Sequence, residues 1–213
     1  MRRLPVYILI DTSGSMSGEP IEAVKNGMQA MMSALRKDPY ALETAYLSVI
    51  TFASDVVQAK PLTEVAQFQP PAVTAGGGTS LGGALKKVAE CAEREVVKST
   101  PDQKGDWKPL VFIMTDGMPT DNFDTGLAEF KKQKWGIVVA CAAGTQADTK
   151  TLMRITECVV RLDAADSNAI AAYFKWVSSS ISTGSKKIDE GRTDISSLGE
   201  LPPPPPEISL VKS

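Results

Sequence analysis

Short apolar runs alternate with amphipathic segments along most of the chain. Continuous apolar runs are typical of strands that are buried on both faces of a mostly parallel sheet. The runs predict strands at residues 4–10, 45–53, 110–114, 136–142 and 158–162. Residues 56–62 predict a further strand, the hairpin partner of residues 45–53. Its Pro61 favours an edge position.

Between these runs, apolar residues recur at helical spacing. The first such segment begins near Pro20, carries a stripe of methionines, and ends at Asp38-Pro39. Core packing explains this stripe. Further helices are predicted at about residues 80–98, 124–134, 149–156 and 167–182. The alternation predicts an α/β fold: a doubly wound, mostly parallel sheet with helices on both faces and one antiparallel edge strand.

The composition changes near residue 184. Residues 1–184 carry all of the predicted helices and strands, so they are expected to form one domain. Residues 185–213 have little apolar periodicity and contain five consecutive prolines at 202–206. This pattern predicts a flexible proline-rich tail with a short polyproline II segment. A docking peptide for a partner is the alternative.

Charge and composition exclude several classes of protein. The 213 residues include 23 Lys+Arg and 25 Asp+Glu, and this balance argues against nucleic-acid binding. No apolar run approaches the roughly 20 residues that a membrane-spanning helix needs. The apolar stretch near the N-terminus ends at Asp11 without a cleavage site, which favours a first strand over a signal peptide.

The chain has no histidine, which excludes Ser-His-Asp and Cys-His catalysis and imidazole-ligated zinc. The cysteines are Cys91, Cys141 and Cys158. They are odd in number, lie far apart and form no CxxC pair, so we expect reduced and mostly buried thiols. These features together predict a cytoplasmic protein.

Oxygen-bearing side chains gather in three predicted loops. The loops are residues 11–15 (Asp-Thr-Ser-Gly-Ser), 76–80 (Gly-Gly-Gly-Thr-Ser) and 115–117 (Thr-Asp-Gly). Asp11 and Asp116 stand at the carboxyl ends of predicted strands, where open α/β sheets bind ligands. We therefore expect the loops to converge, although over a hundred residues separate the two aspartates.

The predicted ligand set contains oxygen alone: two carboxylates and three hydroxyls. Such a set suits a hard divalent cation, Mg²⁺ first, with Mn²⁺ or Ca²⁺ as alternatives. Each piece also has an ordinary local role. Asp11 or Thr79 can cap a helix, and Asp116-Gly117 is a common turn. Their occurrence together favours a metal site.

The pattern Asp11-Thr12-Ser13-Gly14-Ser15 matches DxSxS. With Thr79 and Asp116 it resembles the metal-ion-dependent adhesion site (MIDAS) of von Willebrand factor A domains, which have a Rossmann-like fold. The likeness covers about residues 4–182. It implies that the metal is held by Asp11, Ser13, Ser15, Thr79 and Asp116. The serines and the threonine would supply hydroxyls, and the aspartates would act directly or through water. An acidic side chain of a partner protein would fill the open coordination position.

A narrower likeness concerns the opening RRLPVYILIDTSGSM and the following GEPIEAVKNG. These segments resemble the TerY group of bacterial tellurite-resistance proteins, whose domain is encoded beside a protein kinase and a protein phosphatase. The resemblance implies a scaffold or regulator in a phosphorylation-linked stress response. Some relatives carry an additional cysteine-rich metal domain, whereas this chain has the proline-rich segment.

Enzymatic alternatives fit the motifs poorly. Haloacid-dehalogenase-like phosphatases need a second Asp where Ser13 stands, and neither a P-loop, a GxGxxG turn nor a GxSxG elbow is present. Metal-activated hydrolysis lacks an obvious general base. A purely structural ion that joins the three loops is a further alternative. An exposed ion with a replaceable ligand would favour binding, and a closed ion would favour the structural role.

The sequence thus predicts a cytoplasmic, metal-dependent protein-interaction module and no catalysis. The partner would reach the metal with a Glu or Asp and meet a small apolar rim, which would set specificity. The residues predicted for this rim are Met16, Met118, Pro119 and Phe123. Partial packing beneath the loops is the alternative role for these four side chains.

Overall fold

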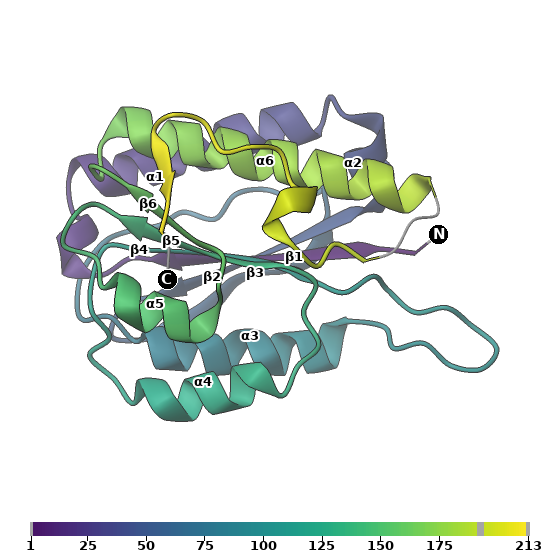
Figure 1. The fold of residues 1–213 in the computed structure, drawn as a ribbon, viewed down its shortest axis with the longest axis horizontal. Coiled ribbons are helices and arrows are strands. Elements are labelled where there is room, and N and C mark those ends of the chain that lie inside the picture. Colours follow the sequence, from purple (N-terminus) through teal and green to yellow (C-terminus); the bar gives the residue numbers. More distant parts are fainter. Residues whose placement is uncertain (1, 191–193, 212–213) are drawn as a thin grey trace.

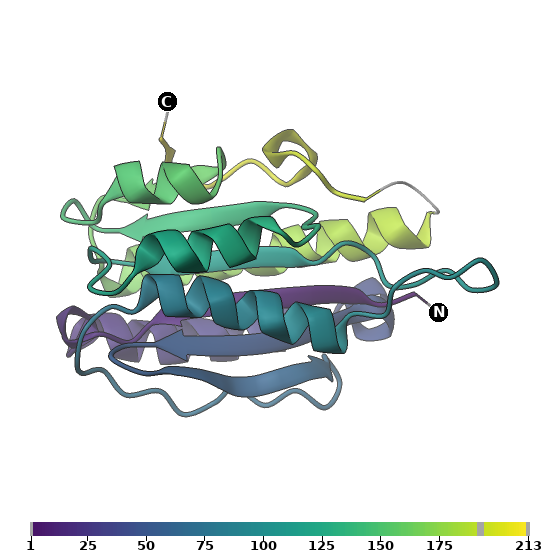
Figure 2. The ribbon, with the colours of Figure 1, turned by 90° about the horizontal axis from the view of Figure 1, so that it is seen from below.

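The computed structural model describes residues 2–190 and 194–211. One seven-stranded sheet lies between two layers of helices (Figure 1, Figure 2). The strands are β1 (Leu4–Asp11), β2 (Ala45–Phe52), β3 (Val56–Glu64), β4 (Leu110–Thr115), β5 (Val138–Ala143), β6 (Val159–Leu162) and β7 (Ile208–Leu210). Their order across the sheet is β3-β2-β1-β4-β5-β6-β7.

The inner strands are parallel and the two edges are antiparallel. β2, β1, β4, β5 and β6 pair in parallel, which confirms the predicted doubly wound sheet. β3 pairs antiparallel with β2, as Pro61 predicts for an edge strand. β7 pairs antiparallel with β6 at the other edge, where no strand was predicted.

Among the described residues, three α-helices cover each face of the sheet. α1 (Glu19–Leu35), α2 (Pro39–Thr44) and α6 (Ser167–Asp189) lie on one side. α3 (Leu81–Glu95), α4 (Phe123–Lys131) and α5 (Thr149–Ile155) lie on the other. α2 begins where the sequence predicts only the end of α1. The Asp38 side chain accepts bonds from two backbone N–H groups of its first turn, so the residue caps a new helix.

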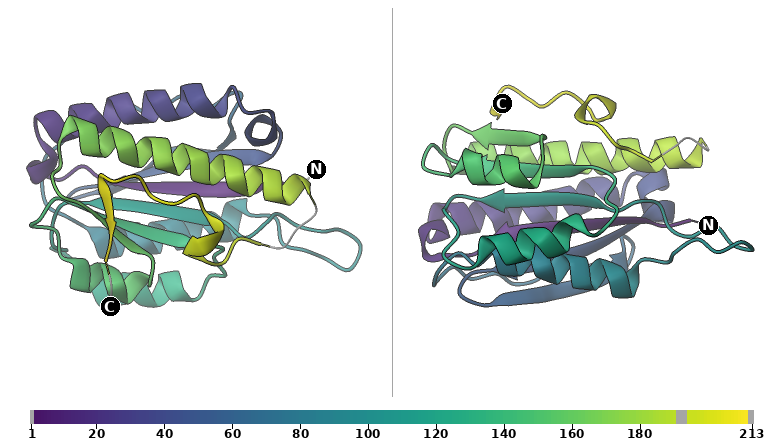
Figure 3. Two further views of the ribbon diagram at one scale, coloured as in Figure 1. Left: turned by 45° about the horizontal axis from the view of Figure 1, so that its top comes forward. Right: turned by 60° about the horizontal axis from the view of Figure 1, so that its bottom comes forward.

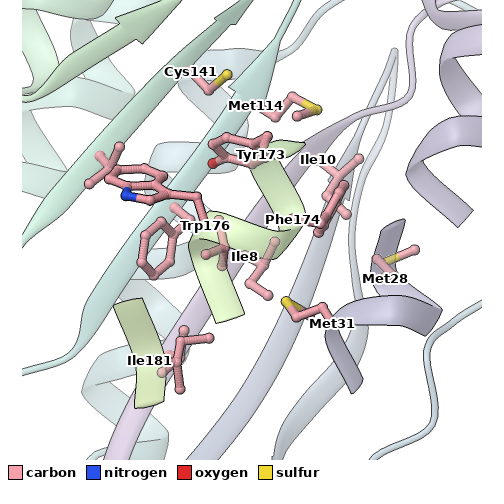
Figure 4. Packing of buried hydrophobic residues seen from close by; sticks show 14 of the residues in the cluster. Ile8, Ile10, Met28, Met31, Met114, Cys141, Tyr173, Phe174, Trp176 and Ile181 are labelled. Atoms are coloured by element: carbon pink, nitrogen blue, oxygen red, sulfur yellow. The ribbon is translucent and has the colours of Figure 1, made fainter. Parts of the chain in front are cut away.

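The core divides along the sheet because β1 sends successive side chains to opposite faces. Ile8 and Ile10 pack against α1 and α6, whereas Tyr7 and Leu9 pack against the α3 and α4 layer. Figure 4 shows the first cluster, in which Phe174 of α6 lies toward Met28 and Met31 of α1. The methionine stripe is buried, which confirms its predicted role in the core.

The C-terminal segment packs against the domain instead of forming the predicted flexible tail. In Figure 3, residues 194–211 run along the α6 side of the sheet and end in β7. Ile195, Leu201 and Ile208 are buried, and the indole N–H of Trp176 donates to the Pro202 carbonyl at 2.8 Å. These single apolar residues lie before and after the proline run and have no periodicity, so the sequence pattern did not reveal them.

Ile195→Ala should lower the free energy of unfolding by about 2–3 kcal/mol, because its 3% exposed side chain fills a core position. Leu210→Ala is the matched control. Its side chain is 48% exposed, and we expect a change of about 0.5 kcal/mol or less. Urea denaturation measures both values. Equal, negligible effects would show that the segment is detached in solution.

No helix in residues 2–190 and 194–211 is long and apolar enough to cross a membrane. All three cysteines are free. Cys91 and Cys141 are buried and Cys158 is half-buried, as predicted for thiols outside a disulfide framework.

Candidate metal centre

The predicted site lies where β1 and β4 end. These strands are neighbours and run parallel, so Asp11 at the end of β1 and Asp116 just after β4 reach the same edge of the sheet. β1 has β2 on one side and β4 on the other, so the direction in which strands are added to the sheet reverses at β1. The site therefore occupies the topological switch point, where open α/β sheets bind ligands. This edge is at the left of Figure 1.

Asp11 is buried and joins the two strand ends. Its Oδ1 accepts a bond from the Ser13 backbone N–H at 2.8 Å, and its Oδ2 accepts one from the Thr115 hydroxyl at 2.5 Å. The first loop is also tied to the glycine-rich loop, because Gly14 N–H donates to the Gly77 carbonyl at 3.0 Å. The carboxylate is thereby fixed before any ligand binds.

A chain of hydroxyl and carboxylate oxygens leads from the interior to the surface. The Ser13 and Ser15 hydroxyl oxygens are 3.0 Å apart, and the Ser15 hydroxyl donates to Asp116 Oδ1 at 2.7 Å. Ser13 is buried, Asp116 is half-buried, and Ser15 is exposed. These oxygens come from both sides of the switch point.

Thr79 reaches the same place from the loop before α3. A Cβ atom on Gly117 would lie 3.3 Å from the Thr79 hydroxyl oxygen, so this hydroxyl lies against the turn after β4. Two hydrogen bonds join Thr79 to Thr120, both at 2.9 Å. The Thr79 backbone N–H donates to the Thr120 hydroxyl, and the Thr120 backbone N–H donates to the Thr79 carbonyl. The Ser54 hydroxyl holds the preceding Gly78 N–H at 3.0 Å. All five predicted ligand residues thus gather at one edge.

Within the described residues, the two carboxylates of the site lack a cationic partner. Neither Asp11 nor Asp116 forms an ion pair within the described part of the chain. Burial raises the pKa of Asp116, the hydrogen bond from Ser15 opposes this shift, and the charge of Asp11 adds to it. A bound cation would remove the unfavourable electrostatic energy that this arrangement carries.

The donor set fits a hard divalent cation. Ligand oxygens about 2.0–2.1 Å from Mg²⁺ in an octahedron lie roughly 2.9 Å from each other. The 3.0 Å and 2.7 Å separations along Ser13, Ser15 and Asp116 are close to this value. The described residues contain no group of three or more His, Cys, Asp or Glu side chains suited to a metal. Metal binding here would therefore depend on the hydroxyls.

Sequence reasoning placed Thr115 in a site loop without giving it a role, and it missed two further residues that support the site, Ser54 and Thr120. Thr115 fixes Asp11, while Ser54 and Thr120 hold the loop of Thr79. Thr115 has a sequence signal, since it directly precedes Asp116 at the end of a strand. Ser54 and Thr120 have none, because their contacts join loops that are far apart in the sequence.

The predicted apolar rim is only partly at the surface. Met118 is 64% exposed and Pro119 is half-buried, so both can border the site. Met16 is buried in the α1 core cluster, and Phe123 is buried where α4 begins. These two side chains are therefore corrected from rim to core. A groove of about 450 Å³ lies beside the site and includes Thr12 and Gly76.

The family model of the von Willebrand factor type A domain matches residues 6–175. The chain belongs to this family. Von Willebrand factor type A domains often mediate metal-dependent protein interactions, and they are generally interaction modules and not enzymes. Domains of this family that carry a MIDAS bind divalent metals. A search of curated protein sequences finds no match.

Solved structures share the fold at low sequence identity. Proximal thread matrix protein 1 from the mussel byssus, in a structure with a zinc-occupied MIDAS motif, has 19% identity and a TM-score of 0.63. The similarity covers 84% of this chain and 48% of the mussel protein. The pilus adhesin SpaC from Lactobacillus rhamnosus GG has 15% identity and a TM-score of 0.66, over 86% of this chain and 31% of the adhesin. This chain thus spans less than half of either protein.

Proposed function

We propose that this von Willebrand factor A domain is a metal-dependent protein-interaction module. The side chains of Asp11, Ser13, Ser15, Thr79 and Asp116 hold a divalent cation directly or through water, Mg²⁺ first, with Mn²⁺ or Ca²⁺ also suited. The cation binds a Glu or Asp side chain of the partner. The continuous run of oxygens from Ser13 to Asp116 is the observation that carries this proposal.

The five residues contribute different groups to the site. Both oxygens of Asp11 already accept bonds from the protein, so this buried carboxylate supplies charge and acts through water. Ser13, Ser15 and Thr79 offer hydroxyl oxygens, and the half-buried Asp116 offers a carboxylate oxygen closer to solvent. When bound, the cation supplies a positive centre that attracts an anionic ligand atom.

The exposure of the outer ligands favours binding over a purely structural ion. Ser15 is exposed and Asp116 is half-buried, so a cation held by these residues would be within reach of a partner's oxygen from the solvent side. Met118 and Pro119 border the site and add apolar contact. Hydrolysis gains no support, because the adjacent groove is lined by Thr12, Gly76 and their neighbours, with neither carboxylate of the site.

The cellular setting is proposed from the TerY-like opening sequence. On this likeness, the module acts in the cytoplasm as a scaffold or regulator of a tellurite-resistance or stress response, with a protein kinase and a protein phosphatase as partners. The free thiols are consistent with a reducing compartment.

A pull-down from cell lysate tests the interaction. Purified wild-type protein should retain a partner in Mg²⁺ and lose it in EDTA, and Asp11→Asn should not retain it. Asp55→Asn is the matched control, because Asp55 is an exposed carboxylate that lines the adjacent groove. Mass spectrometry of the captured proteins tests for the kinase and the phosphatase. Retention that is insensitive to EDTA and to Asp11→Asn would refute metal-dependent binding.

A further inference from the structure

A second cavity lies at the opposite end of the sheet from the metal centre. Its volume is about 540 Å³, within the range of roughly 300–1,000 Å³ that is typical of small-molecule sites. Its walls are the C-terminal ends of α3 and α4 and the loop of residues 96–109, which projects beyond the start of β1 (Figure 1, Figure 2). It shares no residue with the proposed metal site.

Two tryptophans line this cavity, and both are fixed by other contacts. Trp135 stacks on Phe130 with the ring centroids 4.7 Å apart, and its indole N–H donates to the Phe130 carbonyl at 2.9 Å. The Arg2 guanidinium lies 3.7 Å from the centroid of the Trp107 ring, and the Trp107 backbone N–H bonds to Arg3. The cavity therefore has large, rigid aromatic walls that suit a planar apolar ligand.

The lining carries one cation without an ion-pair partner among the residues that the structure describes. Four lysines lie on it, Lys98, Lys108, Lys132 and Lys134, together with the two acids Glu93 and Asp106. Three of these lysines are paired, Lys98 with Glu93, Lys108 with Asp194 and Lys132 with Glu129, so Lys134 is the cation that remains.

The two acids are already neutralised. Asp106 is paired with Arg3 at 2.5 Å, and Glu93 is paired with Lys98. Lys134 is exposed and has no hydrogen-bond or ion-pair partner among the residues that the structure describes. An anionic group at the mouth of the cavity would meet an available cation, whereas a cationic group would meet no free carboxylate of the lining.

We propose that this cavity binds a small organic anion with a planar aromatic body. The ring lies against the walls formed by Trp107 and Trp135, and the carboxylate or sulfonate of the ligand faces Lys134. This binding does not depend on the metal centre, and it is independent of the function proposed there.

The probe is 2-naphthoate, titrated into ¹⁵N-labelled protein in EDTA. The chain has three tryptophans, and their indole N–H resonances report on separate places. The resonances of Trp107 and Trp135 should shift in a saturable way. Trp176 should not shift, because it lies on α6 and bonds to Pro202. No saturable shift, or a shift of all three resonances together, would overturn the proposal.

Charge recognition is tested with Lys134→Gln, which should weaken 2-naphthoate binding about three- to fivefold, the effect of one solvent-exposed ion pair. Lys131→Gln is the matched control, because Lys131 is exposed at the last residue of α4, three residues before Lys134, and lies outside the cavity lining. Binding of neutral 2-naphthalenemethanol should be weaker and unchanged in both variants. Equal affinities of Lys134→Gln and wild type for 2-naphthoate would refute the anion site.

Discussion

Mg²⁺ or Mn²⁺ at a hundred times its dissociation constant should raise the Tm of the wild-type chain by about 5–10 °C. A ligand that binds only the folded state at this concentration adds about 2.7 kcal/mol to the free energy of unfolding. For a protein of roughly this length, each kcal/mol raises Tm by about 2–4 °C. Excess EDTA should return the Tm to its metal-free value.

Asp11→Asn should abolish this shift while leaving the fold intact. The amide oxygen can accept the bond that the Ser13 N–H now donates to Oδ1, and the amide NH₂ can donate to the Thr115 hydroxyl in place of the present bond. The variant therefore keeps both contacts and loses only the negative charge. Asp11→Ala would leave both partners without an acceptor in a buried place, which costs stability for reasons unrelated to metal.

Thermal scans of wild type, Asp11→Asn and Asp55→Asn, each with metal and with EDTA, measure the effect. Asp55→Asn removes one carboxylate charge near the same edge and should retain the full metal-induced shift. A shift of wild type and Asp11→Asn by equal amounts would place the ion elsewhere. No shift in the wild type at millimolar metal would refute the proposed metal centre itself.

The architecture was predictable because its strongest signals are local. β1 and β4 are continuous apolar runs. Asp11 is the last residue of β1, and Asp116 comes directly after β4. The rule that parallel strands carry their ligands at one edge then places Asp11 near Asp116 without knowledge of any contact. The parallel strand order, together with the oxygen-bearing residues at the strand ends, is therefore enough to predict that the candidate ligands lie close together.

The errors occur where long-range contacts decide the outcome. Met16 and Phe123 stand next to predicted site loops, but whether a side chain beside a loop faces solvent or the core depends on how the chain turns there. The segment around Ile195 and Leu201 has too few apolar residues for a periodic pattern, although each one finds a place in the core. The partners of Thr79 lie on another loop, so sequence spacing could not identify them.

Gly126→Ala should lower the free energy of unfolding by about 3 kcal/mol or more, which corresponds to a decrease in Tm of about 6–12 °C. A Cβ atom on Gly126 in α4 would lie 1.8 Å from the Gly82 carbonyl oxygen and 2.7 Å from its Cα. The obstacle is backbone of α3, which no change of rotamer can remove. The two helices must therefore separate.

Helix propensity alone would make Gly126→Ala stabilising by about 1 kcal/mol. A loss of stability would therefore come from the contact between α3 and α4. Gly199→Ala is the control: a Cβ atom there would meet no atom within 4 Å, and its effect should stay within about 0.5 kcal/mol. Gly82 lies in the first turn of α3, three residues after Thr79, so separation of the helices would also move a proposed ligand. Gly126→Ala should thus weaken metal binding as well as stability. A stable variant with unchanged metal affinity would show that the α3 and α4 contact is looser than these distances require.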